Sequence, residues 1–145
     1  SGLALLAQDR ADEAVIAFRG ALAGAPRDNQ ARAQLGLALL RTRHFDEASV
    51  YLTQALRGDP DNGPILTGLA EVAAAKGDNQ RAADFYRRAF AGDWPPGSEA
   101  RRDSAQLAAG RLLAQLGRQR EALAYLMAII EQSGDRPEAG KQAAD

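Results

Sequence analysis

Few side chains in this sequence could carry out acid–base, nucleophilic or metal chemistry. His44 is the only histidine and cysteine is absent, so a thiolate nucleophile, a disulfide and a zinc site built from histidine and cysteine are excluded. The position of His44 between two helical segments favours a surface turn residue over a general base. We therefore predict no catalytic residue, no cofactor and no metal site.

Paired charges in the sequence also favour structural roles. Asp12-Glu13 and Asp46-Glu47 recur 34 residues apart. Catalytic carboxylates do not follow a structural repeat, whereas acidic residues that open helices do, because they suit the positive end of the helix dipole. Arg87-Arg88 and Arg101-Arg102 have acidic neighbours, and a glycine-rich phosphate loop is absent. We interpret these pairs as solvated faces and predict that the chain is not an enzyme.

Length and composition limit the remaining classes of function. The 145 residues suit a single domain, and 18 basic against 19 acidic residues give no excess charge for nucleic acid. No apolar run is long enough for membrane insertion. The chain does not begin with Met, so we expect a segment of a longer protein. Its richness in Ala, Leu and Arg is typical of a high-GC bacterium, and both cytoplasm and periplasm remain open.

Internal repetition indicates how the chain is organised. Several columns of small or apolar residues share spacings of 34, 34 and 40 residues. They are Ala14, Ala48, Ala82 and Ala122; Phe18, Leu52, Tyr86 and Leu126; and Ala21, Ala55, Ala89 and Ile129. Each period reads as helix, turn, helix, because apolar residues recur at helical spacing around a short break. Gly77 and Gly117 are expected just beyond helix ends, and Asp78 is expected at a helix start.

These residues resemble the tetratricopeptide repeat. Its pattern of Leu-Gly in the first helix, Ala, large apolar and Ala in the second, and a closing Pro is matched by Leu35-Gly36, Ala48, Leu52, Ala55 and Pro60. The resemblance implies an all-α fold, in which antiparallel helix-turn-helix repeats stack into a right-handed superhelical solenoid. Small residues at Gly36, Ala48 and Ala55 would let the helices approach closely.

The expected boundaries follow from the same columns. We predict a single tetratricopeptide domain over 1–145, with a partial repeat 1–28, repeats 29–62 and 63–96, an insertion 97–102, a repeat 103–136 and a capping helix or further repeat 137–145. The first repeat should keep only the tail of its first helix, from Leu3 to Gln8. Ser98 and Glu99 should open an elongated first helix in the last repeat.

The resemblance also implies where a partner binds, because first helices in this family line a concave groove. The groove positions in this chain are Gln30, Gln34, Leu37, Arg41, Thr67, Glu71, Ser104, Leu107, Arg111 and Gln115. One subclass of the family binds acidic chaperone tails through a cationic clamp, and here the clamp positions hold no cation. The groove therefore suits an apolar helix or strand of a protein partner.

Several alternatives remain open. Leu37 and Leu40 could pack against neighbouring helices without binding a partner. Trp94 could fold onto a helix or anchor a ligand. The column Tyr51, Phe85 and Tyr125 could pack between repeats or form a convex binding stripe. We expect a non-catalytic interaction scaffold that can self-associate through its ends. The alternatives are an assembly scaffold of the envelope, for a pilus, secretin, cytochrome maturation or exopolysaccharide export, or an accessory module of an enzyme.

Overall fold

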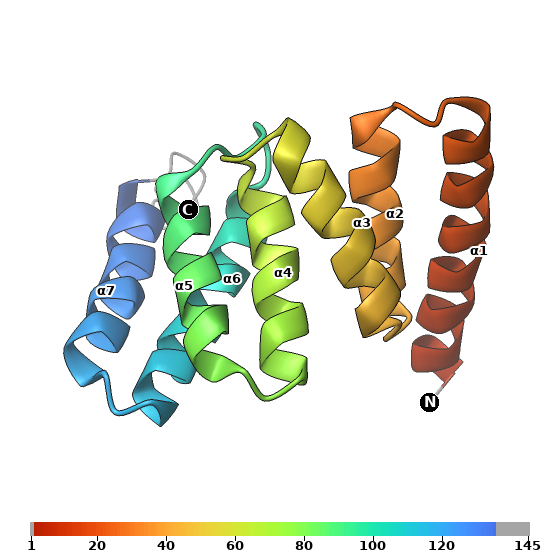
Figure 1. Cartoon of the computed structure of the whole chain (residues 1–145). Helices are drawn as coiled ribbons and strands as arrows, with labels where there is room; N and C mark the ends of the chain where they lie inside the picture. The colour runs from red at the N-terminus through yellow and green to blue at the C-terminus, as the bar shows by residue number, and fades with distance from the viewer. Residues whose placement is uncertain (1, 136–145) are drawn as a thin grey trace. The chain divides into compact units, whose positions relative to one another are not determined.

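The computed structural model describes the backbone of residues 2–135 and the side chains from Arg10 to Gln132. This part of the chain is all-α, with seven helices and no strand (Figure 1). The helices are α1 (Gly2–Gly24), α2 (Asn29–Arg41), α3 (Phe45–Gly58), α4 (Gly63–Ala75), α5 (Asn79–Ala91), α6 (Glu99–Gln115) and α7 (Gln119–Asp135). None of the described helices combines the length and the apolar character needed to cross a lipid bilayer.

The chain divides into two compact units between Asp93 and Trp94. In the first unit, α1 packs against α2, and the hairpins α2–α3 and α4–α5 pack against each other through α3 and α4. In the second unit, α6 and α7 form one hairpin. The helices therefore pack pairwise as antiparallel repeats, as the sequence predicts. The repeat boundaries and the right-handed superhelix stay predictions, and the capping helix 137–145 lies outside the described residues.

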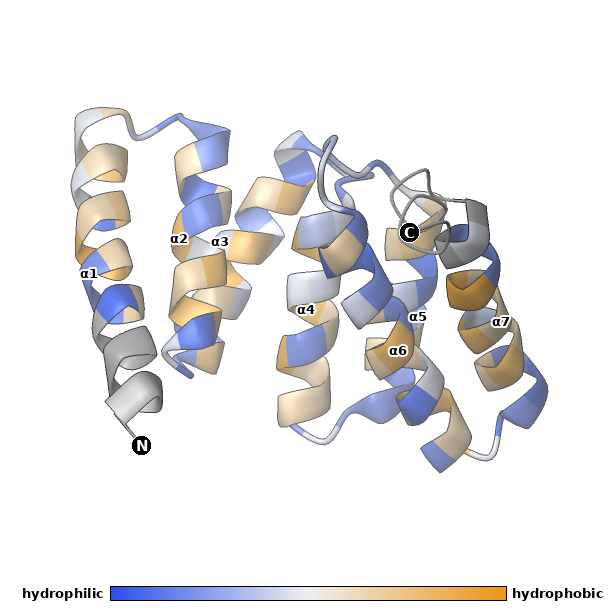
Figure 2. Ribbon diagram, turned by 180° about the vertical axis from the view of Figure 1, so that it is seen from behind, coloured by the Kyte–Doolittle hydropathy of each residue, from blue (hydrophilic) through white to orange (hydrophobic). Residues whose placement is uncertain are grey.

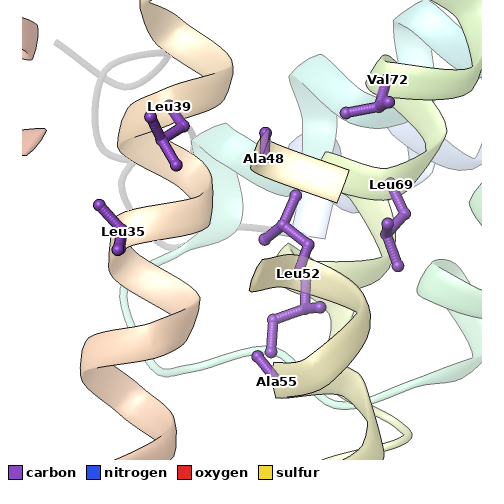
Figure 3. Packing of buried hydrophobic residues seen from close by; sticks show 8 residues of the cluster. Leu35, Leu39, Ala48, Leu52, Ala55, Leu69 and Val72 are labelled. Atoms are coloured by element: carbon purple, nitrogen blue, oxygen red, sulfur yellow. The ribbon is translucent and has the colours of Figure 1, made fainter. Parts of the chain in front are cut away.

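The core of the first unit is centred on α3. The side chains of Ala48, Leu52 and Ala55 are completely buried. Figure 3 shows them between α2 and α4, whose contributions to the same cluster are Leu35, Leu39, Ile65, Leu69 and Val72. The alanines leave room for a close helix crossing, and Leu52 fills the space that remains.

Close approach at this crossing requires glycine in α2. A Cβ atom on Gly36 would lie 2.7 Å from Cγ of Leu52 and 3.2 Å from its backbone nitrogen. The matching place in α6 is less tight, because a Cβ atom on Gly110 would lie 3.2 Å from Cδ2 of Leu126. The prediction that a small residue at Gly36 lets the helices approach closely is thus confirmed, and Gly110 makes a similar contact in the second unit.

The turns within the repeats share one left-handed position. Gly77 and Gly117 have φ angles of +83° and +77°, as expected for residues just beyond a helix end. Arg43, at the same position of the α2–α3 turn, has a φ of +64°. Glycine takes this conformation without steric cost, whereas arginine does so at a cost.

Acidic and amide side chains cap the helices that follow turns. Asp28 accepts hydrogen bonds from the backbone nitrogens of Gln30 and Ala31 at the start of α2. Asn62 does the same for Ile65 in α4. The predicted cap Asp78 is confirmed, because its side chain accepts from a backbone N–H in the first turn of α5.

The expected break in the first helix is wrong. α1 runs without interruption from Gly2 to Gly24, so Asp12 and Glu13 lie inside it and do not open a second helix. The turns at Arg43 and Gly77 correspond by the 34-residue spacing to Asp9, where α1 continues. Gln8, Arg10 and Ala11 are better helix formers than Thr42, His44 and Phe45 at the matching places of the α2–α3 turn, which favours a continuous helix here.

Backbone hydrogen bonds join the two ends of the α4–α5 hairpin. The nitrogen of Asp93 donates to the carbonyl of Asp61, and the nitrogen of Gly63 donates to the carbonyl of Asp93, both at 2.7 Å. Gly92 makes this possible, because a Cβ atom there would lie only 2.3 Å from the carbonyl oxygen of Asp61. We call this pair of bonds the Asp61–Asp93 clasp.

The second unit begins with a loop and the long helix α6. The predicted helix start at Ser98 and Glu99 is confirmed, and α6 has 17 residues against 13 in α2 and in α4. Ser98 does not cap α6 with its side chain; its hydroxyl donates instead to the carbonyl of Pro95.

Candidate functional site

The expected groove positions of the first unit lie on α2 and α4. These two helices are the first helices of successive repeats, and they contact each other directly. Gln34 and Arg41 on α2 and Glu71 on α4 are exposed, and Thr67 is half-buried. We call these four residues together with Leu37 the α2–α4 face. Gln30 is also exposed, at the start of α2.

Leu37 holds the two helices of this face together. It is half-buried and packs against the core cluster. A Cβ atom on Gly68 would lie 2.9 Å from Cδ2 of Leu37, so the leucine covers the glycine of α4 closely. Leu37 is therefore chiefly a packing residue of this face. The same holds for Leu40, which also packs against the cluster.

Thr67 adds a polar group to the α2–α4 face. Its hydroxyl oxygen is buried and has no hydrogen-bond partner among the described residues. A buried polar atom without a partner costs free energy. The hydroxyl therefore belongs to the interior beneath this face and not to its exposed surface.

The electrostatics of this face come from Arg41 and Glu71. The guanidinium of Arg41 lies in the last turn of α2, where a positive charge suits the helix dipole. Glu71 lies near Tyr86 of α5, which is buried. Burial raises the pKa of Tyr86 to about 12, and the negative charge of Glu71 adds to this shift.

The remaining groove positions lie in the second unit, on α6. Ser104, Leu107, Arg111 and Gln115 are all exposed. Their spacings of three and four residues place them along one side of the helix. The structure thus brings the positions of α2 and α4 together, and it presents those of α6 as a separate exposed strip.

The described side chains with catalytic potential take part in local hydrogen bonds and ion pairs. His44 is exposed in the α2–α3 turn, and its Nδ1 atom lies 2.7 Å from the hydroxyl of Thr42. The carboxylates that follow it form ion pairs, Asp46 with Lys76 and Glu47 with Arg19. Among the described residues, no cluster of three or more side chains could hold a metal ion.

The aromatic column contributes to packing in the first unit. Tyr51 and Phe85 are half-buried and pack against the core cluster, which favours packing over a convex binding stripe at these two positions. Phe85 also lies below two guanidinium groups, those of Arg81 and Arg88, at 5.7 and 5.8 Å from its ring centre. Trp94 is half-buried in the loop before α6.

One surface was missed in reading the sequence. Leu123, Met127 and Ile130 on α7 are large, apolar and exposed. A signal was present, because the column of Met127 holds Thr53 and Arg87 in the earlier repeats. Polar residues at that column indicate a solvent-facing position, where methionine is unexpected.

Comparisons with known proteins agree on one type of fold. Two family models described as tetratricopeptide repeat match residues 33–95 and 104–135. No curated protein sequence matches the chain. A solved structure of MamA AMB-1 has a TM-score of 0.65 at 22% identity, covering 86% of this chain and 70% of that one. MamA MSR-1 has 0.62 at 20% identity, covering 84% and 67%. At sequence identities this low, the two matches show a similarity of fold alone.

Proposed function

Because the chain belongs to the tetratricopeptide repeat family, we propose that it is a non-catalytic scaffold that binds a protein partner along its α2–α4 face. Domains of this family are typically protein–protein interaction modules. The first helices of successive repeats are in direct contact here, so a peptide or helix crossing both would meet one continuous surface.

The observation that carries this proposal is the mixed character of the α2–α4 face. It combines the half-buried Leu37 with the exposed side chains of Gln34, Arg41 and Glu71. Binding sites for extended segments or helices pair a small apolar centre with polar groups that fix orientation.

The partner that fits is an apolar helix or strand with separated charges. Arg41 and Glu71 have opposite charges, so a strongly acidic or strongly basic tail would be attracted at one of them and repelled at the other. A segment with one acidic and one basic side chain around a small apolar residue would satisfy both.

A binding experiment with a paired control tests the proposal. Peptides are selected from a random displayed library on the full chain, and their affinities are measured by calorimetry. The test variant is Gln34→Glu with Arg41→Glu on α2. The control is Gln54→Glu with Arg57→Glu on α3, where both side chains are also exposed. Arg41 and Arg57 each lie in the last turn of their helix, so both variants lose a similar dipole contribution.

We expect the α2 variant to lose about tenfold or more in affinity for the selected peptides, because a favourable charge becomes a repulsive one. The α3 control should stay within about twofold of the unaltered chain. Equal affinities for the two variants would place binding away from the α2–α4 face and overturn the proposal. Leu37 is left unaltered, because its packing on Gly68 would make a loss of binding ambiguous.

A further inference from the structure

The helix α7 exposes a stripe of large apolar side chains. The exposed fractions are 58% for Leu123, 51% for Met127 and 71% for Ile130. Figure 2 shows strongly hydrophobic residues over the middle turns of α7. Spacings of four and three residues place the three side chains on one side of the helix, as in the seam of a coiled coil. We call them the α7 stripe.

The same columns are not an apolar exposed stripe in α3. There the corresponding residues are Ser49, Thr53 and Leu56. Thr53 is exposed and polar, and Leu56 packs against the core cluster that α3 shares with α4. The α7 stripe differs from these residues of α3 in two respects. Its central residue, Met127, is apolar, and its outer residues, Leu123 and Ile130, are exposed to solvent. Exposed apolar groups of this kind indicate an interaction surface.

Two opposite charges lie at the ends of the α7 stripe. Arg120 precedes it and Glu131 follows it, and both are exposed. At about 100° per residue, both lie within about 40° of Met127 around the helix, and they are about 16 Å apart along it. Neither forms an ion pair within the described part of the chain. The face therefore reads, in chain order, as positive, apolar and negative.

We propose that the α7 stripe pairs with the α7 stripe of a second copy of this chain, with the two helices antiparallel. A two-fold axis near Met127 brings Leu123 of each copy opposite Ile130 of the other and the two Met127 side chains together. Each Arg120 then lies within reach of Glu131 of the other copy. A parallel pair would instead bring like charges together, so the charge order selects the antiparallel arrangement.

This inference goes beyond the proposed function, because it involves none of the residues of the α2–α4 face. A single pair of helices buries less than the roughly 1,200 Å² of a stable interface. We therefore expect a weak dimer, with a dissociation constant on the order of tens of micromolar. Sedimentation equilibrium of the full chain over a range from about 1 to 500 µM measures it. A chain that stays monomeric throughout overturns the proposal and points to a different occupant of the stripe.

Charge exchange tests the geometry of the pair. Arg120→Glu alone or Glu131→Arg alone brings like charges together at both ends of the dimer, and each should weaken dimerisation by about tenfold. The double variant restores opposite charges and should return the dissociation constant to within about twofold of the original. Glutamate near the start of α7 and arginine near its end both suit the helix dipole, so unfolding is not a competing cause. Absence of rescue in the double variant overturns the antiparallel pairing.

A matched pair of isoleucines separates this dimer from end-to-end association. Ile130 on α7 and Ile16 on α1 have exposed fractions of 71% and 72%. Ile130→Ser should weaken dimerisation by roughly tenfold or more, because each dimer loses two buried side chains. Ile16→Ser should leave it unchanged. Equal weakening by both substitutions, together with species larger than a dimer, would show head-to-tail contacts and overturn the proposal.

Discussion

Replacing Gly36 by alanine sets two opposing effects against each other at one position. Alanine favours the interior of a helix over glycine by about 1 kcal/mol. The added Cβ atom would, however, lie 2.7 Å from Cγ and 2.8 Å from Cδ2 of Leu52, which is completely buried. Extra carbon in a filled core costs about 1–3 kcal/mol. We therefore expect Gly36→Ala to lower the free energy of unfolding by about 1 kcal/mol.

A second glycine isolates the packing contribution. Gly20 lies inside α1, and a Cβ atom there would have no neighbour within 4 Å. Gly20→Ala should therefore raise the free energy of unfolding by up to about 1 kcal/mol. Subtracting the two changes in the free energy of unfolding cancels the helix preference of alanine. What is left is the cost of overpacking at Gly36, about 1–3 kcal/mol. Urea titrations followed by circular dichroism at 222 nm measure both.

A double-variant cycle identifies the clash. Leu52→Ala deletes the two side-chain atoms nearest to the added Cβ, so Gly36→Ala should become less costly in that background, by about 1 kcal/mol or more. The backbone nitrogen of Leu52, at 3.2 Å, remains as a residual obstacle. If Gly36→Ala stabilises the chain as much as Gly20→Ala does, the close helix crossing is not rigid and the reasoning about the core is refuted.

Three further changes test other parts of the first unit. Ala48→Leu should destabilise by about 1–3 kcal/mol in the same urea titration, because Ala48 is completely buried in the α3 crossing. Asp28→Ala should cost about 1 kcal/mol, since it removes two hydrogen bonds to the start of α2, whereas Ser98→Ala removes no cap of α6. The pKa of Tyr86 is raised to about 12, so its hydroxyl stays protonated in the folded state above pH 10, where it loses its proton in the unfolded state. The free energy of unfolding should therefore fall as the pH rises from 10 to 12. Tyr86→Phe should show a smaller fall over the same range.

Much of the fold could be predicted because the same residue types recur at the spacing of the repeats. Ala48, Leu52 and Ala55 recur by column, and burial at these positions follows from close helix packing. The break expected near Asp9 is wrong because the repeat spacing does not register local helix preference, and Gln8, Arg10 and Ala11 favour a continuous helix.

The sequence predicts which side of a helix a candidate residue occupies, but not how deeply its side chain is buried. Gln34 and Arg41 are exposed as expected, whereas Leu37 packs on Gly68. Helical spacing shows which side of a helix a residue occupies, but the depth of burial depends on the neighbouring helix. The burial of the Thr67 hydroxyl without a hydrogen-bond partner depends on the same packing, which helical spacing alone does not reveal.

The Asp61–Asp93 clasp has a mechanical consequence. Its two hydrogen bonds join the chain just before α4 to the chain just after α5, so tension along the polypeptide passes through the clasp before it reaches the hairpin. The helices α4 and α5 are then shielded from a pulling force until both bonds break. Changes of length in the segment after Asp93 can likewise be absorbed outside the clasp. Gly92 permits this contact, so the mechanical resistance of the hairpin depends on the absence of a side chain at this position.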